Sequence, residues 1–107
     1  MAVYDGEVIK EVVYDSVPAK LIERIIIFGS RARNEEDDDS DTDICIIVNE
    51  ELTRDDIRRY RIALNRTFAF EHQMAVDIMM RSMDTFNRYK GVIGGIEHVI
   101  ASEGVML

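Results

Sequence analysis

Two aspartates in the first half of the chain are spaced in a way that suits binding of a divalent cation. Asp41 and Asp43 flank Thr42 at the start of a stretch, Asp41–Val48, whose later residues are all apolar and which predicts a strand. Alternate residues of a strand face the same side, so the two carboxylates should project together. Carboxylate pairs are typical ligands of hard cations such as Mg²⁺. An isolated Asp-x-Asp is also compatible with the solvated end of a loop.

A third acid, Asp77, interrupts an otherwise apolar stretch, Met74–Met80, that predicts another strand. A carboxylate inside such a strand is rarely buried without a partner. If this strand lies beside Asp41–Val48, Asp77 joins the two aspartates on one face, and their carboxylates should converge within about 4 to 6 Å around a shared cation. Without a cation, three like charges there would repel one another or raise a pKa.

The third feature is a sharp corner, Gly29-Ser30. It directly follows Arg24–Phe28, which predicts the first strand because Ile25–Phe28 are all apolar. Glycine lets a phosphate approach the backbone closely, and backbone N–H groups at a corner of this kind favour an anion. By itself a Gly-Ser corner is more often an ordinary turn.

The elements that must position these residues follow from hydrophobic periodicity. Apolar residues at helical spacing, Val8 to Val13, predict a first helix that Pro18 ends. Thr53 should cap a long helix with Asp55 and Asp56 in its first turn. A short helix is predicted from Ser82 or Asp84 to Tyr89, and a last helix from Ile96 to Gly104. The buried stripe of the long helix is expected at Ile57, Tyr60, Leu64 and Phe68, and Cys45 and the six methionines are expected in the core. The predicted order is α-β-β-α-β-α-α.

Composition limits the class of protein. The 107 residues, 47% hydrophobic and 32% charged, predict one domain spanning 1–107. The net charge of −8 argues against a sequence-independent grip on nucleic acid. The longest apolar run, Ile44–Val48, is far below the roughly 20 residues of a spanning helix. With a single cysteine and no signal-like N-terminus, we expect a cytoplasmic protein with no membrane partner.

Together, these motifs resemble a known family. Gly29-Ser30, ten residues, and Asp41-x-Asp43 match the Gly-Ser-x10-Asp-x-Asp signature of the DNA polymerase β-like nucleotidyltransferases. The run Ile25–Arg33 resembles the smallest branch, the minimal nucleotidyltransferase (MNT) antitoxins that accompany HEPN-domain toxins. The resemblance implies an α+β (mixed α/β) fold: a short mixed β-sheet with packed helices. This chain departs from the family pattern at Asn34, where glycine is usual, and in the acidic stretch Glu35–Asp39.

The resemblance also implies roles for individual residues. Gly29 and Ser30 would hold a triphosphate, and Arg31 and Arg33 would neutralise its charge or contact a partner. Catalysis and Mg²⁺ binding would fall to the three carboxylates, Asp41, Asp43 and Asp77.

The implied activity is transfer of AMP from ATP to a tyrosine of a HEPN-domain RNase toxin, which silences the toxin. Two alternatives remain open: an antitoxin that acts by contact alone, and a small-molecule nucleotidyltransferase. The arginine-rich stretch Arg54–Arg66 predicts contact with an acidic surface of the partner, although a solvated helix face would look the same.

Overall fold

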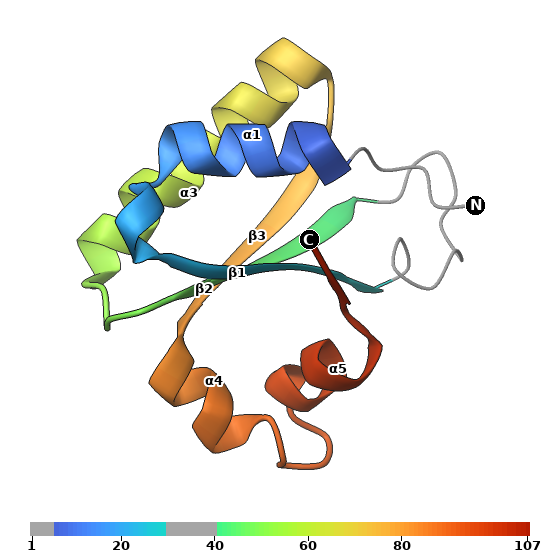
Figure 1. Ribbon diagram of the computed structural model, residues 1–107. Helices are drawn as coiled ribbons and strands as arrows, with labels where there is room; N and C mark the ends of the chain where they lie inside the picture. The colour runs from blue at the N-terminus through green and yellow to red at the C-terminus, as the bar shows by residue number, and fades with distance from the viewer. Residues whose placement is uncertain (1–5, 30–40) are drawn as a thin grey trace.

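A computed structural model describes residues 6–29 and 41–107 of the chain (Figure 1). Ser30, Arg31, Arg33 and the acidic stretch 35–39 lie outside these residues. The elements, in chain order, are α1 (Gly6–Ser16), a 3-10 turn η1 (Ala19–Leu21), β1 (Ile22–Phe28), β2 (Thr42–Val48), α3 (Arg54–His72), β3 (Val76–Ser82), α4 (Met83–Tyr89), α5 (Ile96–Glu103) and β4 (Val105–Met106). The predicted order is confirmed, with one further strand at the end.

The strands form one mixed sheet. Over the described residues it has four strands in the order β3-β2-β1-β4. β1 runs antiparallel to both β2 and β4, whereas β2 and β3 are parallel. The parallel pair is joined through the long helix α3, as a parallel connection requires. The chain therefore has the predicted α+β architecture with a short mixed sheet.

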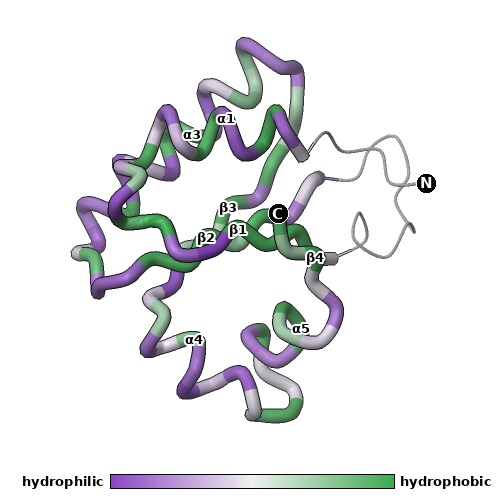
Figure 2. The backbone as a smooth tube through the Cα atoms, in the orientation of Figure 1, coloured by the Kyte–Doolittle hydropathy of each residue, from purple (hydrophilic) through white to green (hydrophobic). Residues whose placement is uncertain are grey.

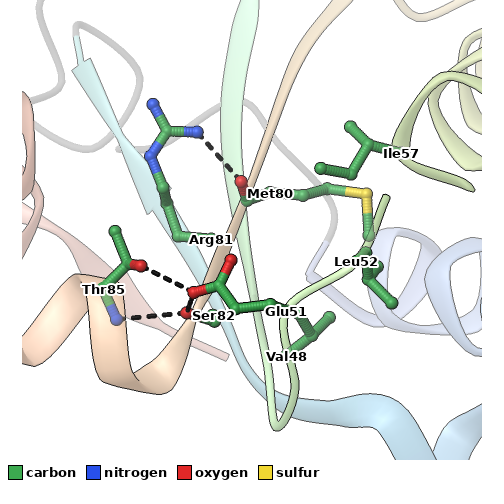
Figure 3. Close-up of a pocket in the computed structure, with 8 residues that line it drawn as sticks. All are labelled: Val48, Glu51, Leu52, Ile57, Met80, Arg81, Ser82 and Thr85. Atoms are coloured by element: carbon green, nitrogen blue, oxygen red, sulfur yellow. Dashed lines mark hydrogen bonds between the residues drawn. The ribbon is translucent and has the colours of Figure 1, made fainter. Parts of the chain in front are cut away.

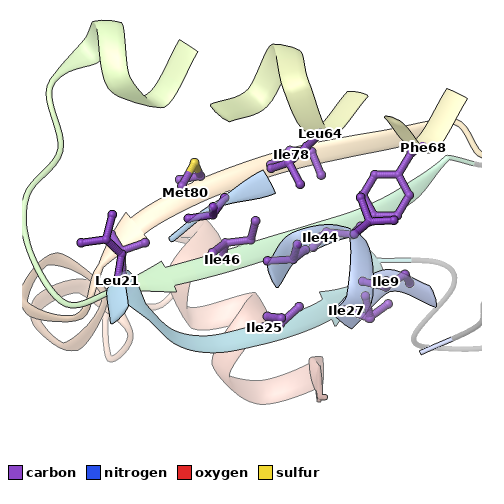
Figure 4. Close-up of a cluster of buried hydrophobic side chains, with 14 residues drawn as sticks. Ile9, Leu21, Ile25, Ile27, Ile44, Ile46, Leu64, Phe68, Ile78 and Met80 are labelled. Carbon is purple, nitrogen blue, oxygen red and sulfur yellow. The ribbon is translucent and has the colours of Figure 1, made fainter. Parts of the chain in front are cut away.

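One face of the sheet packs against α1 and α3, and this layer holds the larger core (Figures 1 and 4). Every second residue of the central strands points into it, for example Ile44 and Ile46 of β2. They meet Leu64 and Phe68 of α3, both fully buried. Ile57 and Tyr60 are only partly buried against this core. The predicted residues of α3 therefore all face the core, but those in the first half of the helix are less deeply buried than Leu64 and Phe68.

The opposite face packs against α4 and α5 and holds a smaller core. Cys45 and Ile47 of β2 lie there with Phe86 of α4 and Ile100 of α5. Both faces of β2 are therefore buried, which explains its continuous apolar sequence. In Figure 2 hydrophobic green prevails along the strands at the centre, whereas the helices alternate between green and purple along their length.

The boundaries of two helices confirm predicted caps. The Thr53 side chain accepts a hydrogen bond from the backbone N–H of Asp56 and begins α3, and Ser82 does the same for Thr85 at the start of α4. Met74, predicted to begin the third strand, instead lies in the turn after α3, where its backbone N–H donates to the backbone oxygen of Phe68. The strand consequently runs from 76 to 82, two residues later than predicted.

Two further details concern the surface. Met106 is largely exposed, so the expectation that all methionines lie in the core is wrong at this position. No helix within residues 6–29 and 41–107 is both long enough and apolar enough to cross a membrane.

Candidate active site at the start of the parallel strands

Asp43 and Asp77 are direct neighbours across the parallel strands β2 and β3. Both side chains alternate with residues of the α1/α3 core, so they share the sheet face that Cys45 and Met79 occupy further along the strands. Neighbouring strands lie about 4.8 Å apart, which puts the two carboxyl groups within reach of one small ligand. The expected placement of Asp77 beside the Asp41–Val48 strand and on the same face is thus confirmed.

Asp43 and Asp77 differ in burial, and Asp77 is not enclosed as its apolar strand would suggest. Asp43 is half-buried, whereas Asp77 is exposed at the edge strand β3. Water therefore solvates the Asp77 carboxylate, and its charge carries no large burial penalty.

Gly29 forms the third side of this corner. It follows β1 directly, and Phe28, the last residue of β1, pairs with Asp43. Gly29 has a φ of +73°, and a Cβ placed there would overlap the Oδ2 atom of Asp43. Glycine is required at this position for its backbone conformation and for the space it leaves beside the carboxylate. The backbone corner and the acid therefore form one site, which the sequence could only suggest.

Asp41 is exposed and directly precedes β2. Within the described ranges 6–29 and 41–107, no three His, Cys, Asp or Glu side chains are gathered closely enough to hold a metal ion. The expected convergence of all three carboxylates is therefore absent, although Asp43 and Asp77 are paired. Like charges repel, and carboxylates approach closely only around a cation. Ser30, Arg31 and Arg33, also predicted for this site, lie outside the described residues.

The donor chemistry fits a hard divalent cation. The available ligands are carboxylate oxygens, the type that Mg²⁺ prefers, and the absence of a side chain at Gly29 lets the Asp43 carboxylate lie against the backbone corner. These features would allow the adjacent carboxylates of Asp43 and Asp77 to hold Mg²⁺ at the start of the parallel strands, with Asp41 just before β2.

A pocket of about 390 Å³ adjoins Asp77. It passes around the edge strand β3, and its polar lining includes Arg61 of α3 and Arg81 of β3 beside Asp77. Sequence reasoning did not single out Arg81, although a second charge four residues after Asp77, on the same strand face, was the available signal. Apolar walls come from both sheet faces, including Ile57 on the α1/α3 side and Phe28 on the α4/α5 side.

The two arginines of this pocket differ in their ion pairs within the described residues. Arg81 donates to Glu97 of α5 at 3.3 Å and to the backbone oxygen of Met80 at 2.9 Å. The Arg81 side chain is 34% exposed and that of Glu97 13% exposed, so the pair ties α5 to the edge strand. Arg61 makes no ion pair within the described part of the chain, so its charge is available to a ligand.

A separate polar cluster lies at the other end of the same strands (Figure 3). Glu51, just after β2, accepts hydrogen bonds from the hydroxyls of Ser82 and Thr85, the latter at 2.7 Å. The Ser82 oxygen in turn accepts the backbone N–H of Thr85, at 3.1 Å, as the cap of α4. These bonds, that of Ser82 first, lower the pKa of Glu51. The cluster fastens α4 to the β2–α3 connection, remote from Asp43 along the strand.

Comparison with known protein families gives a match. The family described as Polymerase beta, Nucleotidyltransferase matches residues 7–104. This range includes Gly29, Asp41, Asp43 and Asp77. No curated protein sequence matches the chain significantly.

Two solved structures share the fold. One is a toxin–antitoxin complex of MntA and HpeT in which two aspartates are changed to glutamate; it has a TM-score of 0.66 and 17% identity, over 96% of this chain and 71% of that one. The other is a putative nucleotidyltransferase from Sulfolobus solfataricus, with a TM-score of 0.57 and 24% identity, over 94% of this chain and 73% of that one. At these identities the likeness concerns the fold alone. The match over residues 7–104 shows that the chain belongs to the Polymerase beta nucleotidyltransferase family.

Proposed function

We propose that this chain is an antitoxin that transfers AMP from ATP to a tyrosine hydroxyl of a HEPN-domain RNase toxin in the cytoplasm. The observation that carries the proposal is the pairing of Asp43 with Asp77 across β2 and β3, with Gly29 against Asp43. The likeness to the MntA–HpeT complex supports a toxin as the partner. A further domain for a small substrate is not needed if the acceptor is itself a protein.

The reaction forms a bond between the tyrosine oxygen and the α-phosphorus of ATP. The bond from that phosphorus to the oxygen bridging to the β-phosphate breaks, and pyrophosphate leaves. Mg²⁺ held by Asp41, Asp43 and Asp77 would neutralise charge on the phosphates.

The residues of the chain have distinct tasks in this scheme. Gly29, with Ser30 after it, would present backbone N–H groups to the phosphates at the end of β1. Asp77, exposed at the strand edge, accepts the proton of the attacking hydroxyl and orients it. Arg61 places a positive charge in the pocket next to Asp77, on the side from which the acceptor hydroxyl attacks.

The test uses a purified HEPN-domain toxin, with Mg²⁺ and ATP labelled at the α-phosphate. Intact mass should show one or more AMP units on the partner. The adduct should disappear with Asp43→Asn or a chelator and persist with Asp15→Asn, a matched change at the exposed end of α1. If the native chain silences the toxin without any adduct, it acts by contact alone and the transferase proposal is wrong.

A further inference from the structure

A groove of about 440 Å³ runs along the exposed side of α3. We call it the α3 groove; its lining residues are Arg54, Ile57, Arg58, Arg61, Ile62 and Asn65. These positions recur at helical spacing and span about 16 Å at 1.5 Å per residue. That length matches about five residues of extended chain.

The arginines of the α3 groove have no acidic partners. Among the described residues, Arg54, Arg58 and Arg61 form no ion pair, whereas Arg59 on another side of the helix pairs with Asp56. Arg54 and Arg58 are four residues apart, a spacing at which like charges destabilise a helix. A chain with net charge −8 thus carries a concentrated positive stripe without local compensation.

The α3 groove is continuous with the candidate active site. Ile57 and Arg61 line both this groove and the pocket that contains Asp77. A ligand that lies along α3 therefore reaches Asp77 at one end. Ile62, 47% exposed, adds an apolar contact between the arginines.

We propose that the α3 groove docks an acidic, extended segment of the acceptor protein and leads its hydroxyl to Asp77. This step rests on the proposed function in that the acceptor is a protein. Carboxylates of the segment pair with the guanidinium groups of Arg54, Arg58 and Arg61, whose planar donors match carboxylate geometry. An apolar side chain of the segment contacts Ile62.

The lining favours a polypeptide over a nucleic acid. None of the six residues of the α3 groove is aromatic, so bases would have no stacking platform. The remaining acidic surface would repel a phosphate backbone. The stripe also extends beyond the reach of a single triphosphate placed at Asp43, because Arg54 lies about two helical turns from Arg61.

The first test measures binding without ATP or metal. The probe is a fluorescein-labelled peptide of about ten residues, rich in glutamate, with one leucine and a terminal tyrosine. By fluorescence anisotropy the native chain should bind it, and should not bind the same peptide with glutamine in place of glutamate. Arg54→Glu/Arg58→Glu should weaken binding at least about tenfold, because it replaces two attractions with two repulsions. Arg66→Glu, the same charge change outside the groove, should not.

A second arm guards against loss of folding. The double variant should keep the native far-ultraviolet circular dichroism and should bind a lysine-rich version of the peptide more tightly than the native chain does. Equal binding of the glutamine peptide, or binding unaffected by the double variant, overturns the proposal. Tighter binding of single-stranded RNA, lost in the same variant, overturns it in favour of a nucleic-acid groove.

The transfer reaction gives an independent reading. The double variant should raise the concentration of toxin needed for half-maximal transfer about tenfold and leave that of ATP unchanged. If the native chain transfers nothing, the proposed function fails while the peptide measurement still decides the docking site.

Discussion

Gly29 lies so close to Asp43 that any side chain at position 29 would overlap the carboxylate. We therefore expect Gly29→Ala to displace the Asp43 carboxylate and to lower AMP transfer by about 100-fold, the scale of loss when a reacting group is misplaced by an ångström. The positive φ adds a folding cost of about 1 kcal/mol. Transfer kinetics and thermal unfolding would measure the two effects separately.

Gly94 supplies a matched control. It also has a positive φ, +90°, but a Cβ there meets nothing within 4 Å. Gly94→Ala should lose a similar amount of stability and keep full activity. Equal losses of activity in the two variants would mean that backbone strain, and not the Asp43 contact, makes Gly29 necessary.

The charge pair at positions 43 and 77 predicts an unusual effect of a single mutation. Asp43→Asn removes the repulsion between neighbouring carboxylates on β2 and β3, so the metal-free variant should be as stable as the native chain or more stable by up to about 1 kcal/mol. Added Mg²⁺ should raise the melting temperature of the native chain and not that of the variant, because only the native site, with both carboxylates, binds the ion. A clear loss of stability in the metal-free variant would show that Asp43 is held mainly by favourable contacts.

The sequence was sufficient for the elements whose signals are local. The stretch Asp41–Val48 predicted a strand, and Thr53 predicted the start of α3; both are confirmed. Strand β4 was missed because two residues carry no periodicity, and it exists only because Val105 pairs with Ile27. Long-range pairing of this kind is invisible to a local pattern.

In the candidate site, too, local motifs were predicted and long-range contacts were not. The Gly-Ser and Asp-x-Asp spacing predicted the corner, and the placement of Asp77 followed from assuming adjacent strands, which the register confirms. The pocket containing Arg61 and Arg81 was not predicted, since α3 and β3 contribute one arginine each and meet only in the folded chain. From the sequence, the arginines of α3 predicted only contact with an acidic partner. That Arg61 of this helix also lines the pocket beside Asp77 is visible only in the structure.

Glu51 makes the stability of the chain depend on acid pH. Its pKa in the folded chain lies below the ordinary value of 4.5, because the Ser82 and Thr85 hydroxyls favour the ionised form. The stabilisation is fully present above pH 4.5 and is lost as the pH falls through the folded pKa. Glu51→Gln should therefore lower the urea midpoint at pH 7, and the difference from the native chain should shrink below pH 4.5. Glu50→Gln, the exposed neighbour, should show no such pH dependence.

Cys45 makes the stability depend on alkaline pH. Burial raises the pKa of its thiol from 9.0 to about 12, and Arg81 opposes the shift only in part. The folded chain therefore holds the neutral thiol, while the unfolded chain forms the thiolate above pH 9. The free energy of unfolding is therefore unaffected by the ionisation of Cys45 below pH 9. It falls as the pH rises from 9 toward 12, by about 1.4 kcal/mol per pH unit. Urea unfolding between pH 8 and 11 should show that slope in the native chain and a shallower one in Cys45→Ala, whatever its absolute stability. Parallel slopes, or rapid reaction of the native thiol with a disulfide reagent at pH 8, would show that Cys45 is accessible to water and would contradict its burial between β1 and β3.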